Sequence, residues 1–132
     1  MSKFPQKPTA SELEILHVLW TRGPSTVREV LDCLNEKKDM GYTGVLKLLQ
    51  IMTLKGTVRR DETQRAHVYE ARRPAEQTKR QLARDMLQRV FAGSASQLMM
   101  HALATHRASP EEIEELRRIL DEYKGDGDDQ SR

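Results

Sequence analysis

The 132-residue sequence is poor in cysteine, aromatic residues, glycine and proline, and it has no long hydrophobic run. Its single cysteine, Cys33, excludes an internal disulfide and has no neighbouring cysteine with which to bind a metal, so we expect an ordinary helix residue. Seven glycines and five prolines are too few for a fibrous or disordered chain. Because no apolar segment is long enough for a bilayer or a secretory signal, we expect no membrane insertion and a cytoplasmic location.

Charged residues are abundant, at 32% of the chain, and their signs are unevenly distributed. Residues 1–73 contain 13 Lys and Arg against 9 Asp and Glu, whereas residues 74–132 contain 9 against 11. The first part therefore has a net charge of +4 and the second −2. This asymmetry favours a nucleic-acid-facing first part and a partner-facing second part, although chance scatter of surface charges also produces differences of this size.

Hydrophobic periodicity is most informative over residues 42–56, where it predicts a helix. The buried stripe of this helix has the spacing i, i+3, i+4 and i+7: Val45, Leu48, Leu49 and Met52. The opposite face carries Thr43, Lys47 and Gln50, which are short or hydrogen-bonding side chains able to enter a groove. Lys55 in the last turn, with a glycine directly after it, is typical of a helix end.

A helix is also predicted over residues 9–22, close to the N-terminus. Ser11 and Glu14 have the spacing of a capping box, and a glycine and a proline follow the segment. Its apolar face is formed by Leu13, Ile15, Leu16, Leu19 and Trp20. We therefore expect this helix to pack against the rest of an N-terminal helical unit.

The next predicted helix, over residues 26–38, begins with a second capping box, Thr26 and Glu29. Its expected buried residues are Val27, Val30, Leu31 and Leu34. A polar turn over 37–41 then leads into the helix of residues 42–56. Three helices with so little chain between them predict a helix-turn-helix arrangement.

Residues 57–71 change to the alternating pattern of two short strands, 57–61 and 67–71, joined by a polar loop. This predicted hairpin, or wing, is surrounded by basic residues: Lys55, Arg59, Arg60, Arg65, Arg72 and Arg73. Positive charge on a protruding hairpin suits contact with phosphate oxygens. A solvated basic edge that discourages strand aggregation is the alternative, but the position directly after a helix with a polar outer face favours phosphate contact.

Residues 74–124 are predicted to form three helices with apolar faces, broken at Gly93 and restarted at Ser109. The apolar residues that we expect at an interface between two chains are Leu82, Met86, Val90, Leu98, Met99, Leu103, Ile113, Leu116, Leu120 and Tyr123. A homodimer would bury these faces mutually and would double the contact with a palindromic site. The alternative is a three-helix lobe packed on its own N-terminal domain.

No metal site, cofactor or enzymatic centre is predicted. His101 and His106 are five residues apart and do not share a helix face in the i, i+4 sense. The aspartates of residues 125–132 lack the rest of a calcium loop, so a disordered tail is expected there. The sequence contains no nucleophile elbow, phosphate loop, HExxH motif or pair of catalytic carboxylates.

In their order and spacing, the short motifs of this chain resemble the penicillinase-repressor (BlaI/MecI/CopY) family. The segments that carry the resemblance are Pro8–Leu16, Leu19–Trp20, Gly23–Val30, Gly41–Val45, Leu48–Leu49, Lys55–Tyr69 and Glu111–Leu116. They extend over nearly the whole chain except for a short tail. The resemblance implies a homodimeric winged-helix repressor that binds a palindromic double-stranded DNA operator.

The expected fold is thus mainly α with a small β-hairpin. It comprises a winged helix-turn-helix over 1–73, a helical dimerisation domain over 74–124 and the tail. The resemblance places Tyr42, Thr43, Gly44 and Lys47 at the start of the recognition helix, Thr26 on the supporting helix, and Arg60 and Arg65 in the wing. With Gln50 and Lys55 from the residue pattern, these form the predicted DNA-binding set.

The chain also departs from the family pattern within its recognition helix. Gly44 replaces a usual threonine, Gln50-Ile51 a frequent Asn-Arg pair, and Leu46 and Leu54 common lysines. Several hydrogen-bond donors are therefore missing, and the family's usual operator sequence is not carried over to this chain. Two other classes of function stay open: a winged-helix interaction module without sequence-specific DNA binding, and a regulator that senses a small ligand.

The inducing signal follows only from the resemblance. Beta-lactam-responsive relatives are released by proteolysis in the dimer domain, downstream of a membrane sensor-protease, and Met99–Leu103 is the matching segment here. Copper-responsive relatives use a cysteine-rich C-terminal hook, which this sequence lacks. The expected partners are therefore operator DNA, a second copy of the chain and a sensor-protease system.

Overall fold

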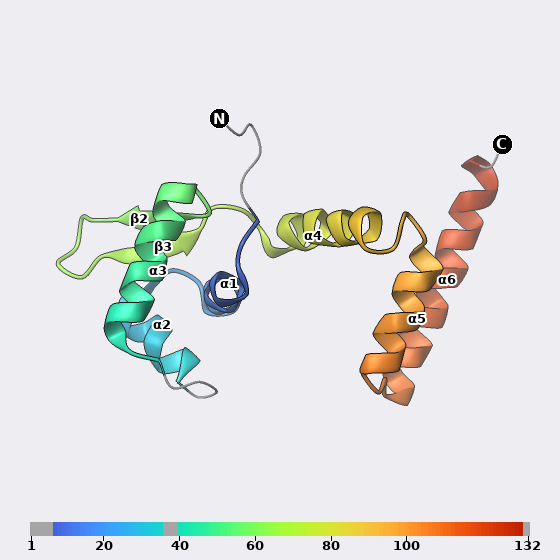
Figure 1. Ribbon diagram of the computed structural model, residues 1–132, viewed down its shortest axis with the longest axis horizontal. Helices are drawn as coiled ribbons and strands as arrows, with labels where there is room; N and C mark the ends of the chain where they lie inside the picture. The colour runs from blue at the N-terminus through green and yellow to red at the C-terminus, as the bar shows by residue number, and fades with distance from the viewer. Residues whose placement is uncertain (1–6, 36–39, 131–132) are drawn as a thin grey trace. The chain divides into compact units, whose positions relative to one another are not determined.

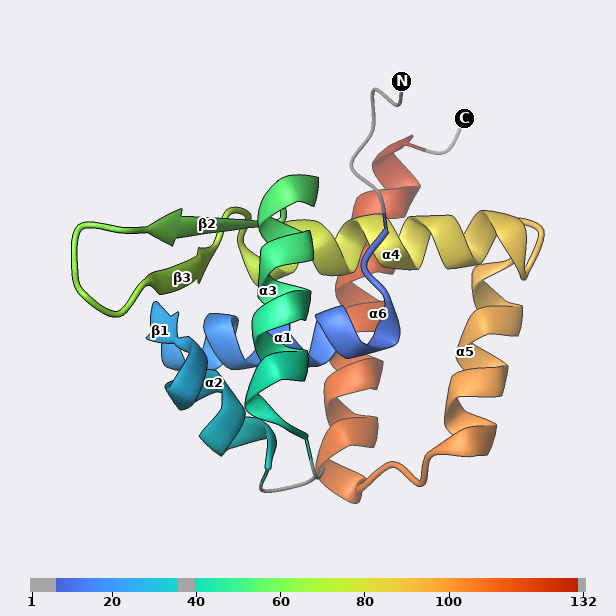
Figure 2. The same cartoon turned by 60° about the vertical axis from the view of Figure 1, so that its left-hand side comes forward.

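The computed structural model describes residues 7–35 and 40–130, and the chain divides into two compact units, Met1–Arg84 and Asp85–Arg132 (Figures 1 and 2). In chain order the described elements are α1 (Ala10–Arg22), β1 (Ser25–Thr26), α2 (Val27–Leu34), α3 (Tyr42–Lys55), β2 (Val58–Asp61), β3 (Val68–Ala71), α4 (Ala75–Arg89), α5 (Ala95–Thr105) and α6 (Pro110–Gln130). This confirms the mainly helical fold with a small antiparallel sheet. Among these helices none has the length and apolar character needed to cross a membrane.

Helix α1 begins at a different cap from the predicted one. Its N-cap is Thr9, whose hydroxyl accepts the backbone N–H of Glu12 at 3.2 Å, while the Glu12 carboxylate accepts the Thr9 N–H at 3.1 Å. The prediction of Ser11 and Glu14 as the capping box was therefore wrong. Two Ser/Thr-x-x-Glu patterns overlap in this segment, and the observed one starts the helix directly after Pro8.

The predicted caps of α2 and α3 are confirmed. Thr26 and Glu29 form a reciprocal capping box, with distances of 2.9 and 3.2 Å. Helix α3 ends at Gly56, whose φ of 85° lies in the left-handed region where glycine carries no steric penalty. Helix α2 ends at Leu34, with Asn35 as its C-cap, so the predicted end at residue 38 was wrong. The predicted turn over 37–41 falls largely outside the described residues.

The sheet has the order β1-β3-β2, with antiparallel pairing throughout. Strands β2 and β3 form the predicted hairpin, whose loop projects away from the helices in both ribbon views (Figures 1 and 2). The sequence did not predict β1, since two residues give no alternating pattern; Ser25 and Thr26 pair with Tyr69 and Val68. This pairing fixes the start of α2 beside the wing.

A single core joins α1, α2, α3 and the sheet. Its buried apolar residues are Ile15, Leu16, Leu19, Val27, Val30, Leu31, Leu34, Val45, Leu49, Met52, Val58 and Tyr69. Three of the four residues in the predicted inner stripe of α3 are fully buried, and Leu48 is partly buried. Helix α3 is thereby held by one face, which leaves the opposite face at the surface.

Helices α5 and α6, in the second unit, run roughly antiparallel (Figure 2). None of the described side chains from 85 to 124 is buried. The backbone of α6 is helical through Gln130, whereas the sequence predicted a disordered tail from residue 125. A glycine costs only about 1 kcal/mol within a helix, so Gly125 and Gly127 do not by themselves stop one that is already formed.

Candidate nucleic-acid interface

The outer face of α3 presents polar side chains to solvent from its first turn to beyond its middle. Thr43, Lys47 and Gln50 are all exposed, as the helical spacing predicted. Gly44 lies among them, and an added Cβ at this position would meet no atom within 4 Å. A partner could therefore approach the backbone of this turn without obstruction.

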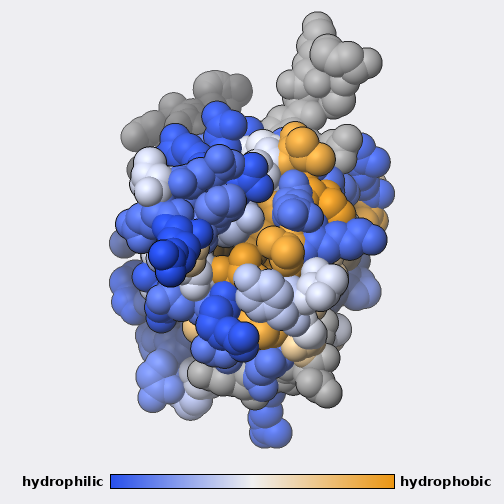
Figure 3. Space-filling view, turned by 90° about the vertical axis from the view of Figure 1, so that its left-hand side faces the viewer, coloured by the Kyte–Doolittle hydropathy of each residue, from blue (hydrophilic) through white to orange (hydrophobic). Residues whose placement is uncertain are grey.

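A shallow hollow of about 270 Å³ adjoins this face, between the start of α2, the start of α3 and the wing. Three residues of the predicted DNA-binding set line it: Thr26, Tyr42 and Arg65. Figure 3 views the side of the molecule that carries α3 and the hairpin, and shows apolar side chains reaching the surface among hydrophilic ones. The hollow is thus bordered by both hydrogen-bonding and apolar groups.

Arg28 and Tyr42 join the first turn of α2 to the first turn of α3. The guanidinium carbon of Arg28 lies 5.6 Å from the centroid of the Tyr42 ring, which is cation–π geometry. Arg28 also lines the hollow and is exposed. This contact orients a positive charge beside the first turn of α3.

Two of the three wing arginines form ion pairs with carboxylates of the wing itself. Arg59 pairs with Glu70 at 2.6 Å, and Arg60 pairs with Glu62 at the same distance. A hydrogen bond with Tyr69, together with Glu62, raises the pKa of Arg60 above its usual range. The third wing arginine, Arg65, is exposed and lines the hollow, and within the described residues no ion pair holds it. Arg65 is therefore the best placed of the three for a phosphate.

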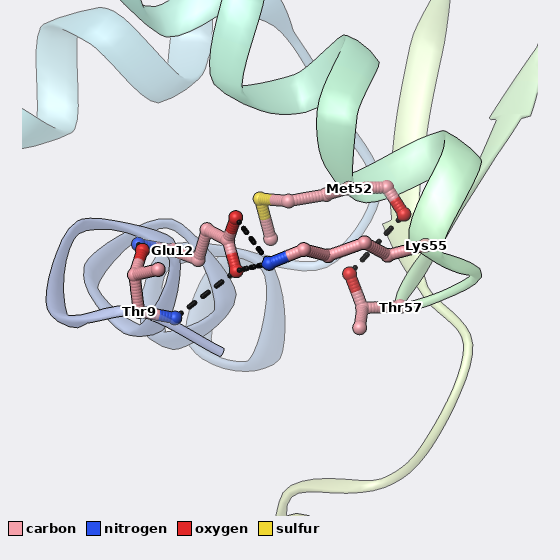
Figure 4. Close-up of polar contacts among 5 residues, drawn as sticks. All are labelled: Thr9, Glu12, Met52, Lys55 and Thr57. Carbon is pink, nitrogen blue, oxygen red and sulfur yellow. Dashed lines mark hydrogen bonds and ion pairs between the residues drawn. The ribbon is translucent and has the colours of Figure 1, made fainter. Parts of the chain in front are cut away.

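Lys55 is directed into the domain instead of toward the outer face of α3. Its ammonium group donates to both carboxylate oxygens of Glu12 at 3.0 Å, and the Lys55 side chain is only 19% exposed (Figure 4). Glu12 is almost completely buried and also accepts the N–H of Thr9. Lys55 therefore joins the end of α3 to the start of α1, and its charge is already compensated.

Of the residues predicted at the interface between two chains, Leu82 alone lies in the first unit. It lines a small hollow with Leu16 and Trp20, inside the first unit, where the Trp20 indole also donates to the carbonyl of Arg73 at 3.0 Å. The start of α4 thus belongs to the winged unit. The other predicted residues are partly or largely exposed: Met86, Val90, Leu98, Met99, Leu103, Ile113, Leu116, Leu120 and Tyr123.

Comparison with known proteins gives a match to the penicillinase-repressor family model over residues 8–122, most of the chain. The chain belongs to the penicillinase-repressor family. This confirms the resemblance seen in the motif order. The match includes both the winged unit with its α3 face and most of the described part of the second unit.

Curated relatives of this family member are similar over nearly their full lengths. The penicillinase repressor of Bacillus licheniformis is 27% identical over 94% of this chain and 96% of its own. The transcriptional regulator BlaI of Mycobacterium tuberculosis is 32% identical over 86% and 82%, respectively. The methicillin resistance regulatory protein MecI of Staphylococcus aureus is 20% identical over 85% and 91%. The names of these relatives describe repressors and regulators.

Six residues that line the hollow are absent from the set predicted from the sequence, and Arg28 and His67 are the two of them with a basic side chain. Arg28 lies two residues after the Thr26 cap, so a basic residue in the first turn of the supporting helix was the available signal. No sequence signal indicated His67, because its position depends on how the wing returns to α2. In the described part of the chain, no three His, Cys, Asp or Glu side chains gather as a metal site would require.

Proposed function

We propose that this family member represses transcription as a homodimer in the cytoplasm by binding a palindromic DNA operator. The observation that carries the proposal is the exposed polar face of α3, with Thr43, Lys47 and Gln50, beside a hollow that contains Arg28 and Arg65. A helix of this kind enters the major groove, while flanking basic groups meet the backbone. Repression then follows from occlusion of the promoter and needs no chemistry on DNA.

The residues divide into those that read bases and those that bind phosphates. Gln50 suits a bidentate contact with adenine, and Lys47 suits guanine. Arg28, Arg65 and the hydroxyl of Thr26 are placed at the border of the hollow, where the DNA backbone would pass. The Thr26 oxygen accepts the N–H of Glu29, and its hydroxyl also contacts the Glu29 carboxylate, so Thr26 fixes the start of α2 at the border of the hollow.

Homodimerisation is supported by the composition of α5 and α6. Both helices expose large apolar side chains: Met99, Met100, Leu103, Ile119, Leu120 and Tyr123. None of the described side chains between 85 and 124 is buried, so the second unit, taken by itself, contains no closed core. A second copy would cover these faces, because an isologous interface packs the same apolar patch of both subunits together.

Sedimentation velocity over a concentration series tests the dimer. The change Leu103→Glu places a charge on the apolar face of α5, whereas the matched control Gln97→Glu adds the same charge at an exposed polar position of that helix. We expect the parent and the Gln97 variant to sediment as dimers and the Leu103 variant to dissociate. A monomeric parent at micromolar concentration would contradict the proposal.

Release by proteolysis is a further part of the proposal and rests on the family alone. The segment Met99–Leu103 lies in the middle of α5, and its helical backbone would have to unwind before a protease could bind it. Cleavage there would separate the apolar surface of α5 into two pieces. Exposure of cells to an inducer, followed by mass spectrometry of the repressor, would show a cut in this segment; an intact chain in derepressed cells would exclude it.

The function is tested by incubating the purified protein with a randomised duplex library at low and near-physiological salt and sequencing the bound fraction. Enrichment of a palindrome with half-sites about 34–36 Å apart, or a multiple of that spacing, is the expected result. Binding that disappears with salt and leaves no motif would mean phosphate attraction alone. The interaction-module alternative would then be favoured, and Leu54, which is 89% exposed on α3, would be a contact in it.

A further inference from the structure

Leu46 is an apolar side chain at the centre of the proposed DNA-binding surface. It lies one helical turn after Tyr42 and one turn before Gln50, and about 60° around the helix from Thr43. Its inner part packs against the core, but the residue is only partly buried and lines the hollow together with Thr26 and Arg65. Apolar side chains reach the surface on this side of the molecule (Figure 3).

Core packing accounts for the buried part of Leu46 but not for the part that borders the hollow. The other groups at the hollow are mainly polar, basic or aromatic. On the major-groove edges of DNA, the apolar group is the 5-methyl of thymine, and an apolar side chain that covers it removes both from water. Leu46 and a thymine methyl are therefore complementary.

We propose that Leu46 is a specificity-determining residue that contacts the 5-methyl group of a thymine in each half-site. The inference rests on the proposed function, since it needs α3 in the major groove. Side chains four residues apart on a helix have their Cβ atoms about 5–6 Å apart, and successive bases rise about 3.4 Å. The thymine therefore lies within about two base steps of the base contacted by Gln50.

The test exchanges thymine for deoxyuridine, one position per half-site at a time, in the most enriched palindrome. This exchange removes only the methyl group and leaves every hydrogen-bonding group in place. Affinities are measured for the parent chain, for Leu46→Ala and for the matched control Leu54→Ala. Leu54 is exposed in the last turn of α3, about 12 Å further along the axis, and does not line the hollow.

For the parent and the Leu54 variant, we expect one thymine whose replacement weakens binding about fourfold per half-site, the effect of one buried methyl-sized group. The Leu46 variant should bind the thymine and deoxyuridine duplexes equally. If Leu46→Ala does not fold, as judged by circular dichroism, Leu46→Asn, which has the branched shape of leucine without its methyl groups, is measured in its place. The deoxyuridine series on the parent chain uses no variant, so it tests the methyl contact even if a Leu46 variant does not fold.

Three results would overturn the inference. In the first, no thymine-to-deoxyuridine exchange affects the parent, although a palindrome is enriched; the proposed function then stands and the methyl contact does not. In the second, the Leu46 variant keeps the full dependence on the methyl group. In the third, the Leu54 variant loses it instead. If no sequence is enriched at all, the proposed function fails and the inference fails with it.

Discussion

The ion pair between Glu12 and Lys55 leads to a prediction that separates a structural lysine from a DNA-binding one. We consider the change Lys55→Met, which keeps the apolar stem and removes the charge. The Glu12 carboxylate, with a side chain 3% exposed, would retain the Thr9 N–H but lose the ammonium group that contacts both of its oxygens. A buried carboxylate without its cation is the main cost.

The magnitude follows from the burial of the two partners. Removing one member of a fully buried pair costs about 3–5 kcal/mol. Because the Lys55 side chain is 19% exposed, water screens part of this loss, and we expect a decrease of about 2–3 kcal/mol in the free energy of unfolding. Glu12→Gln keeps an acceptor for Thr9 and lets the lysine reach solvent, so its cost should be smaller, about 1–2 kcal/mol.

Urea unfolding measures these changes, and the single tryptophan, Trp20, provides a fluorescence signal from within the winged unit. The double variant of Glu12 and Lys55 should lose less than the sum of the single variants, by about 1–2 kcal/mol, since the two side chains interact. All midpoints should be compared at equal m-values, because a change in m would signal altered compactness.

DNA binding supplies the decisive second measurement. Lys55→Met should leave the slope of log affinity against log salt unchanged, whereas Arg65→Met should reduce its magnitude by about 0.9 for each phosphate that the side chain no longer neutralises. The reasoning is refuted if Lys55→Met costs less than about 0.5 kcal/mol of stability and lowers the salt slope as the Arg65 variant does. Lys55 would then bind a phosphate, as the sequence predicted.

Three further predictions concern backbone positions and pH. Gly44→Ala should stabilise the chain by about 1 kcal/mol in urea unfolding, since the added Cβ meets open space within a helix; a loss of DNA affinity at the same time would show that DNA approaches the backbone there. Gly56→Ala should destabilise it by about 1–2 kcal/mol because φ is 85°, and an unchanged midpoint would contradict that conformation. The hydrogen bond from the Thr26 N–H, and after it the charge of Arg22, lower the pKa of Glu29 below 4.5, so the ionised Glu29 carboxylate stabilises the folded chain. This stabilisation is complete above pH 4.5 and is lost as the pH falls through the lowered pKa of the folded chain. In acid unfolding, Glu29→Gln should not show this loss of stability.

The helices could be predicted from the sequence wherever burial follows a helical period. The stripe of α3, the capping box of α2 and the glycine after α3 are local patterns, and the structure confirms them. The strands of the wing were likewise indicated by their alternating residues. In α1 the same reasoning chose the wrong one of two overlapping capping patterns, because nothing local distinguishes Thr9 from Ser11.

Features that depend on distant residues could not be predicted. Glu12 and Lys55 are 43 positions apart, and only the packing of α1 against the end of α3 brings them together. Strand β1 forms because β3 supplies its partner, and the hollow collects residues from α2, α3 and the wing. The outer face of α3 was predictable, whereas the neighbours that share its surface, such as Arg28, were not.

The most direct test of the account is the ratio of two affinities at near-physiological salt: binding to the enriched palindrome and to a scrambled duplex of equal composition. The account predicts that the parent prefers the palindrome by at least about a thousandfold and that Gln50→Ala lowers this preference at least about fivefold with unchanged binding to the scrambled duplex. A parent that binds both duplexes equally, or a Gln50 variant with the preference of the parent, would contradict base reading by the outer face of α3.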